Sequence, residues 1–255
     1  MPMRKRGRIG STERQASHNC EVKDPFERTA QAGKKFAIPT PAAVTFHRLR
    51  TIAGAVSRLW QDLGGTPNSH TSVHEEHSDR VALFSWRIAR LIGLPKEQVE
   101  RILRGAYLHD VGSVGVPDAI MLKPESLSVE ERRAIQVHPR ISYELLHAFL
   151  STEDLGEIAL AHHERFDGDG YPNGLQGRKI PPEARVLTIA DSLDAMLSRR
   201  PYRNPLPFSK AMSEITRGAG KQFDPSIVEV LARQGKTLAG FLGAPSGAHT
   251  ASLAR

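Results

Sequence analysis

Apolar residues recur at intervals of three and four along most of the chain between residues 39 and 240. This spacing places them on one face of an α-helix. No stretch shows the strict alternation of apolar and polar residues that is typical of a β-strand. The pattern therefore predicts an all-α protein, a helical bundle in which each helix contributes an apolar stripe to a shared core.

The first predicted helix occupies residues 39–65, and its apolar stripe has two interpretations. The stripe consists of Phe46, Leu49, Ala53, Val56 and Trp60, at alternating spacings of three and four. Such a seam can pair with its own copy as in a coiled coil, which would make the protein a homodimer. A stripe that faces the core of its own domain is the interpretation we favour, and the homodimer stays open.

The two ends of the chain differ from this helical region. Residues 1–38 are basic and contain few large apolar side chains, and residues 241–255 are mostly small and polar. We expect both segments to be flexible tails. Between them, after the first helix, residues 66–240 are predicted to form one domain.

Composition limits the class of protein. Of the 255 residues, 39% are hydrophobic, enough for a sizeable core. No apolar run approaches the roughly 20 residues of a membrane-spanning helix, and the basic N-terminus lacks the apolar segment of a secretory signal. The single cysteine, Cys20, excludes an internal disulfide and a zinc–thiolate cluster. We therefore expect a cytoplasmic protein without membrane contact.

The formal net charge of +7 raises the question of nucleic-acid binding. Much of the basic excess lies in the first 35 residues, where a solvated tail accounts for it. No basic stretch is interleaved with aromatic residues as a single-strand binding face requires. A small anionic ligand, rather than a nucleic-acid polymer, is the predicted partner.

The later helices share one feature, an imidazole or a carboxylate on or beside the apolar stripe. His77 shares a face with Val81 and Phe84, and His138 is predicted to share one with Ile141 and Leu145. Comparable positions belong to His109, Asp110, His162, His163, Asp191 and Asp194. Burying several such groups on faces without lysine or arginine is costly unless a cation compensates. We therefore expect these side chains to converge on metal.

Three segments carry motifs in a fixed order: LHDVGSVGVPDAIMLKP, HHERFDGDGYPNGLQGRKIP and ARVLTIADSLDAMLSRRPYR. A His-Asp dipeptide alone arises by chance, but its combination with a His-His pair, a Gly-Tyr-Pro loop and an Asp-bearing helix is specific. With this combination the chain resembles the HD-GYP family, a branch of the HD-domain metal-dependent phosphohydrolases. The resemblance runs from roughly His70 to Val230.

The resemblance implies an all-helical fold that holds two or three metal ions and hydrolyses cyclic di-GMP. The implied metal ligands are His77, His109, Asp110, His138, His162, His163 and Asp191. Asp110 is the expected bridge between two ions, with His77, His109 and Asp191 on one side of it and the remaining histidines on the other. Imidazole and carboxylate ligands suit iron or manganese and also accept nickel or zinc. Two such ions can hold a bridging hydroxide that attacks a phosphodiester.

The resemblance also implies substrate contacts. Tyr171, in the glycine-rich loop, is expected to stack on or hydrogen-bond to a guanine, and Arg200 and Arg203 match basic residues that grip the phosphates. Arginine can bind phosphate oxygens through two parallel hydrogen bonds. Asp194 matches a further polar residue that orients a ligand or a water, and is grouped with Asp110 as catalytic.

Two positions depart from the family pattern. Val73 stands where members with three metals have a glutamate, so we expect two ions. Ser113, also assigned to the catalytic group, stands where the family usually has a phosphate-side lysine. We therefore expect a slow cyclic di-GMP phosphodiesterase that yields linear pGpG, with GMP as an open further product. Two alternatives remain: a weak or inactive module that binds cyclic di-GMP or a partner protein, and a hydrolase of another cyclic dinucleotide.

Overall fold

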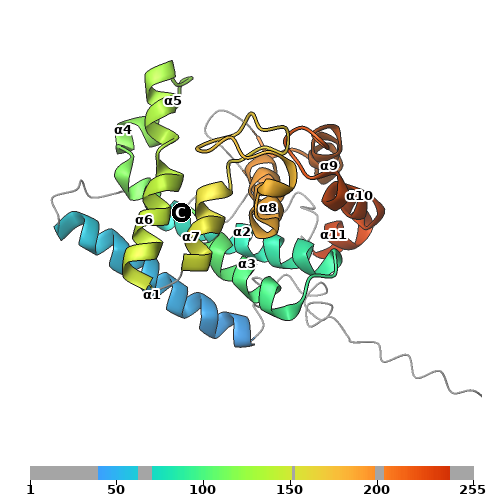
Figure 1. The fold of residues 1–255 in the computed structure, drawn as a ribbon, viewed down its shortest axis with the longest axis horizontal. Helices are drawn as coiled ribbons and strands as arrows, with labels where there is room; N and C mark the ends of the chain where they lie inside the picture. Colours follow the sequence, from blue (N-terminus) through green and yellow to red (C-terminus); the bar gives the residue numbers. More distant parts are fainter. Residues whose placement is uncertain (1–39, 63–70, 151–152, 199–203, 242–255) are drawn as a thin grey trace, which may run out of the picture.

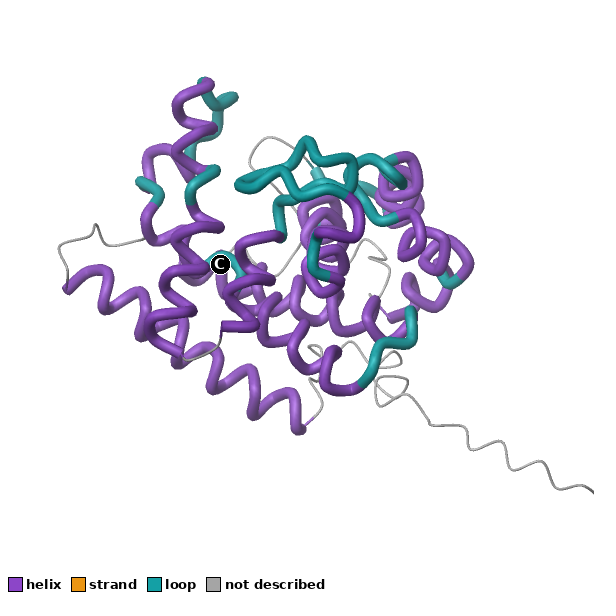
Figure 2. Tube along the Cα trace, viewed as in Figure 1, coloured by secondary structure: helices purple, strands orange, loops and turns teal. Residues whose placement is uncertain are grey.

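The computed structural model of the chain describes residues 40–62, 71–150, 153–198 and 204–241. Within these ranges the elements are helices joined by turns and loops, which confirms the all-α prediction (Figures 1 and 2). The α-helices are α1 (Thr40–Asp62), α2 (Thr71–Leu91), α3 (Lys96–Leu108), α4 (Asp118–Met121), α5 (Val129–Ile135), α6 (His138–Leu150), α7 (Glu153–Ala161), α8 (Pro182–Leu197), α9 (Phe208–Arg217), α10 (Pro225–Arg233) and α11 (Gly235–Phe241). Short 3-10 helices follow α3 and precede α8, namely η1 (Val111–Gly115) and η2 (Gly177–Lys179). The predicted tails lie outside the described residues, except that α11 ends at Phe241.

The core lies where α2, α3, α7 and α8 pack against one another (Figure 1). Its fully buried side chains include Ile88, Ile102, Ile158 and Leu187. Burying an isoleucine or leucine contributes roughly 1.5–3 kcal/mol, so these stripes hold the helices that carry the candidate site. None of the helices in the described ranges is long and apolar enough to cross a membrane.

Helix α1 packs along α3 and η1 of its own chain. Leu49 is 4% exposed and Val56 5% exposed, so part of the predicted stripe is covered within one molecule. The side chains of Phe46 and Trp60 lie outside the described part of the chain. The burial of Leu49 and Val56 supports the core-facing interpretation, and the homodimer stays a prediction.

The buried face of α6 differs from the predicted one by one residue position. The side chains it buries completely are Ser142 and Leu146, whereas Ile141 and Leu145 are only half-buried. Ser142 is tolerated there because its hydroxyl donates to the His109 carbonyl and accepts from the Gly112 N–H. This polar contact brings η1 against the start of α6.

Gly112 makes that approach possible. A Cβ at Gly112 would lie 2.3 Å from the His138 carbonyl oxygen and 2.3 Å from the Ser142 nitrogen, so only glycine fits. The close approach places the start of α6 beside the junction of α3 and η1. His138 and Asp110 therefore come together although they are distant in sequence.

Residues 162–181, which include η2, join the end of α7 to α8 and carry the Gly-Tyr-Pro sequence in a loop (Figure 2). Gly168 and Gly174 have φ angles of 90° and 64°, which other residues rarely adopt. The backbone N–H groups of Phe166 and Asp167 donate to the carbonyls of Gln222 and Lys221. These bonds hold the loop against the segment that precedes α10.

Candidate functional site

The side chains expected to bind metal come together where α2, α3, α6, α7 and α8 meet. They are His77 in the middle of α2, His109 and Asp110 between α3 and η1, His138 at the first residue of α6, His162 and His163 directly after α7, and Asp191 in α8. Most of these positions are helix ends. The side chains there can point inward while the backbone turns away from the site.

Asp110 faces a different set of imidazoles with each carboxylate oxygen. Its Oδ1 lies 3.2 Å from Nε2 of His138 and 3.5 Å from Nε2 of His162. Its Oδ2 lies 3.3 Å from Nε2 of His109 and 3.8 Å from Nε2 of His77. Ligand atoms bound about 2.1 Å from one ion are separated by roughly 3–3.5 Å, which most of these distances match. The arrangement fits a carboxylate shared by two cations.

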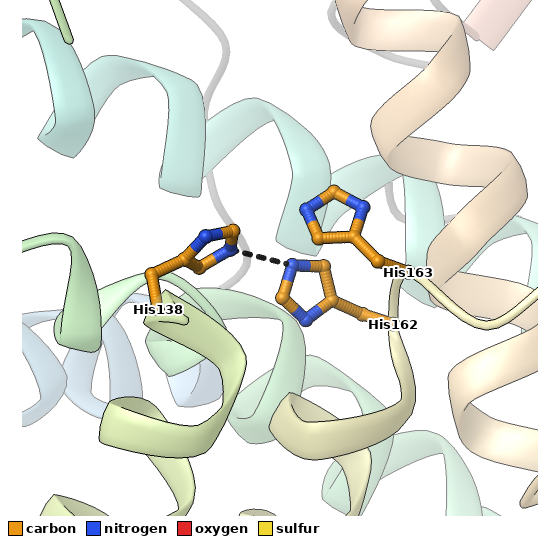
Figure 3. Close-up of side chains that lie close together, drawn as sticks. All are labelled: His138, His162 and His163. Carbon is orange, nitrogen blue, oxygen red and sulfur yellow. Dashed lines mark hydrogen bonds between the residues drawn. The ribbon is translucent and has the colours of Figure 1, made fainter. Parts of the chain in front are cut away.

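Two clusters of ligand atoms flank Asp110. The ligand atoms of His138, His162 and His163 lie within 4.8 Å of one another (Figure 3). On the other side, His77, His109 and Asp191 form a second cluster, in which Nε2 of His77 lies 3.5 Å from Oδ1 of Asp191. Imidazole and carboxylate donors without thiolate suit iron, manganese, nickel or zinc. The His/Asp clusters therefore fit divalent transition metals.

Backbone carbonyls orient three of the imidazoles. Nδ1 of His109, His138 and His162 lies 2.7, 2.7 and 2.5 Å from the carbonyl oxygen three residues earlier. Because a carbonyl only accepts, each Nδ1 carries a proton and donates it. Each Nε2 is then free in the neutral ring and points into the site, the usual state of a metal-binding histidine.

The pKa shifts follow from burial and neighbouring charges. Burial and the neighbouring imidazoles lower the pKa of His163, and burial also lowers the pKa of His162, so both rings are neutral at pH 7 and their nitrogens can accept a metal ion. Burial opposes the protonation of His109, but the Asp110 and Asp191 carboxylates outweigh it and raise its pKa to about 9. Burial raises the pKa of Asp110, but His109 beside it holds that pKa well below its usual range. A bound cation would replace the His109 proton as the partner of Asp110.

Asp194 was expected to orient a ligand or a water, and the structure gives it other neighbours. Its side chain is 1% exposed. Its Oδ2 lies 2.7 Å from Nδ1 of His77, and its Oδ1 accepts from Nε of Arg80 at 2.6 Å. Burial raises the pKa of Asp194, but the bonds from His77 and Arg80 lower it to about 2. Asp194 therefore fixes the ring of His77, and the expectation of no arginine on these faces was wrong.

Tyr171 lies over the histidine cluster. Its ring stacks on His163 with 4.8 Å between the centroids and 29° between the planes. Its backbone N–H donates to the His163 carbonyl at 3.2 Å. Burial, together with the negative charges of Asp110 and Asp191, raises the pKa of the Tyr171 hydroxyl. The phenol therefore stays neutral at pH 7 and can stack or donate a hydrogen bond.

Sequence reasoning missed Glu164. This carboxylate is 1% exposed and accepts the backbone N–H groups of Asn173 and Leu175 at 2.7 and 2.9 Å. The available signal was its position directly between the His-His pair and a glycine-rich loop, where free backbone donors need an acceptor.

Of the remaining predicted residues, Ser113 lies in the described part of the chain. Ser113 is 6% exposed in η1, and its N–H donates to the Asp110 carbonyl at 2.9 Å. Arg200 and Arg203 lie outside the described part of the chain, as does the side chain of Val73. The predicted phosphate contacts of the two arginines therefore stay predictions.

Comparison with known proteins identifies the family. The profile of the HD domain family matches residues 68–227, more than half of the chain. The chain belongs to the HD domain family, and the resemblance drawn from its motifs is confirmed.

Three similar proteins illustrate the match. The chain is 44% identical over 164 residues to a cyclic di-GMP phosphodiesterase of Thermotoga maritima, covering 64% of this chain and 45% of that protein. It is 39% identical over 157 residues to the 3'3'-cGAMP-specific phosphodiesterase 2 of Vibrio cholerae, covering 61% of this chain and 30% of that protein. The solved structure of Bd1817, an HDG"Y"P protein from Bdellovibrio bacteriovorus, shares the fold with a TM-score of 0.55 at 18% identity, over 86% of this chain and 74% of that one. The chain thus spans less than half the length of these two curated relatives.

Proposed function

We propose that the chain is a metal-dependent phosphodiesterase that opens the ring of cyclic di-GMP to linear pGpG. The observation that carries the proposal is Asp110, whose two oxygens face separate imidazole clusters. Two divalent ions bound there would supply an activated water nucleophile and stabilise charge on the attacked phosphate. Iron or manganese are the expected metals, and nickel or zinc are compatible with the same ligands.

The chain's own residues then have separate tasks. Asp110 would serve as the shared ligand of the two ions, while Asp194 and the backbone carbonyls fix the imidazoles in the tautomer that leaves Nε2 free. Tyr171, stacked on His163, offers an aromatic face beside the ligands, where a guanine base can stack. Burial of His109, His138 and His162 keeps water away from one side of the site.

A second candidate substrate is 3'3'-cGAMP, because one of the similar proteins is specific for it. Both molecules present a phosphodiester flanked by purines, so the two-cluster site suits either. A binding module without turnover is the second candidate function, and the uncharged Ser113 next to the site favours it.

The test is a product assay. Protein purified without chelator is incubated with manganese or iron and either cyclic di-GMP or 3'3'-cGAMP, and the products are separated by chromatography. We expect pGpG from cyclic di-GMP, and no product from Asp110→Ala. Turnover of 3'3'-cGAMP and not of cyclic di-GMP would show that 3'3'-cGAMP is the substrate. Binding of cyclic di-GMP without any product would establish the binding module.

A further inference from the structure

Glu164 is a buried carboxylate that contacts the loop and not the ligand cluster. Its Oε1 accepts from the N–H of Asn173 at 2.7 Å, and its Oε2 accepts from the N–H of Leu175 at 2.9 Å. Both oxygens are thus used on one loop segment, directly after Tyr171 and Pro172. Hydrogen bonds to a buried carboxylate are among the stronger ones in proteins.

Asn173 is held at its side chain as well as its backbone. While its N–H donates to Glu164, its Oδ1 accepts from Arg140 at 3.1 Å. Arg140 lies in the first turn of α6, two residues after His138, and Glu164 directly follows His163. The loop is therefore fastened to the two chain segments that supply the histidine cluster of Figure 3.

Gly170 fixes the other side of Tyr171. A Cβ at Gly170 would lie 2.3 Å from the Arg165 nitrogen and 2.6 Å from the Glu164 Cα, so the loop backbone lies directly on the backbone at Glu164. Tyr171, the next residue, donates its N–H to the His163 carbonyl. The contacts at Gly170 and Asn173 hold the loop on both sides of Tyr171, whose ring stacks on His163.

We propose that Glu164 is a positioning residue that holds Tyr171 over the cluster of His138, His162 and His163 and thereby sets the affinity for the nucleotide base. The proposal rests on the proposed function, because it assumes that Tyr171 meets a purine. Both carboxylate oxygens of Glu164 are used on the loop. Glu164 acts through the loop, with Arg140 and Asn173 as the second attachment.

The central variant is Glu164→Gln. The amide keeps one acceptor oxygen but turns an N–H donor toward a backbone donor, so at least one charge-assisted hydrogen bond is lost. We expect the KM for cyclic di-GMP to rise about ten- to a hundred-fold, the equivalent of one such bond, with a smaller change in kcat. The matched control is Glu157→Gln, the same chemical change at an exposed position of α7, which should leave KM unchanged.

Two further measurements separate positioning from general damage. In a Tyr171→Ala background, Glu164→Gln should add little to KM, because a residue acting through Tyr171 has nothing left to position. Hydrogen exchange of the Tyr171, Asn173 and Leu175 amides in the metal-loaded protein should be faster in Glu164→Gln than in the wild type. Metal content should stay equal.

The exchange measurement needs no substrate, so it decides the role of Glu164 even where the wild type yields no product and the proposed function fails. Unchanged exchange at the three amides, or fully additive effects of the two substitutions on KM, overturns the proposal. Where Glu164→Gln does not fold, Glu164→Asp serves instead. It keeps the charge on a side chain one methylene shorter, and exchange equal to the wild type in that variant likewise overturns the proposal.

Discussion

Nε2 of His138 lies 3.3 Å from Nε2 of His162. Each ring donates its Nδ1 proton to a backbone carbonyl, so in the neutral state neither Nε2 carries a proton. Two lone pairs that face each other at this distance are unfavourable unless a cation or a proton lies between them. This buried pair is therefore a physical reason for metal that does not depend on the sequence motifs.

Metal content is the first prediction. Protein purified without chelator should contain about two transition-metal ions per chain, the count that a carboxylate between two clusters implies. His163→Ala should lower the occupancy of one ion more than the other, because His163 belongs to one cluster. Elemental analysis measures the total, which should fall toward one ion per chain in His163→Ala. Essentially no metal, or a reproducible three ions, contradicts the two-ion site.

Asp194→Asn tests the support of His77. The amide keeps the size of the side chain but removes the charge that balances Arg80 and orients His77. We expect affinity for the ion near His77 to fall about 10- to 100-fold, the usual effect of removing a residue that hydrogen-bonds to a metal-binding histidine. Titration against a coloured chelator measures the affinity. Asp62→Asn, an exposed change in α1, is the control. Equal metal affinities in the two variants would show that Asp194 does not support metal binding by His77.

The convergence of the histidines could be predicted from the sequence because helical periodicity relates most of them to an apolar stripe within one turn or two. It could not reveal the partner of Asp194, because Arg80 is 114 residues away and the contact depends on how α2 meets α8. Glu164 was missed for a related reason, since its partners are backbone groups of a loop whose path follows no periodic pattern. The phase of α6 was wrong because Ser142, a polar residue, is buried by hydrogen bonds to η1.

Acid stability should depend on Asp224. This residue caps α10 by accepting from the Ser226 N–H at 2.8 Å and pairs with Arg185. Burial raises the pKa of Asp224, but the bonds from Ser226 and Arg185 outweigh it and leave that pKa below its ordinary value. A carboxyl with a lowered folded-state pKa stabilises the fold above its unfolded pKa of about 3.9 and loses that contribution as pH falls below it.

Asp224→Asn keeps the helix cap, since Asn caps as well as Asp, but replaces the charge-assisted bond to Arg185 with a neutral one. The substitution should therefore lower the free energy of unfolding at pH 7 by about 1 kcal/mol, the difference between a charge-assisted and a neutral hydrogen bond. The difference between variant and wild type should shrink as the pH falls through about 4. Urea unfolding at several pH values measures it. A difference that stays constant over this pH range would show that the charge of Asp224 contributes nothing.

Val56→Glu separates the two interpretations of α1. Because Val56 is 5% exposed within one chain, a charge there is buried without a partner, and we expect destabilisation of roughly 2 kcal/mol or more. Urea unfolding and light scattering are measured together. A wild-type dimer that Val56→Glu converts to a monomer of unchanged stability would instead establish the coiled-coil seam.

Ser113→Lys tests whether a missing charge limits the rate. Ser113 lies in η1, three residues after Asp110, and is 6% exposed. A lysine stem can carry its ammonium beyond a buried backbone position, and a serine hydroxyl supplies no charge. A charge-assisted contact to phosphate is worth roughly 1.5–3 kcal/mol, or about one to two decades in rate if it acts in the transition state.

We therefore expect Ser113→Lys to raise kcat/KM toward cyclic di-GMP by about ten- to a hundred-fold. Ala119→Lys, which adds the same charge at an exposed position of α4, should not, because its ammonium is solvated. Asp110→Ala should abolish turnover in either background, since no other described carboxylate faces both histidine clusters. If the wild type binds the dinucleotide and Ser113→Lys still yields no product, the chain is a binding module whose clusters serve to hold the ligand.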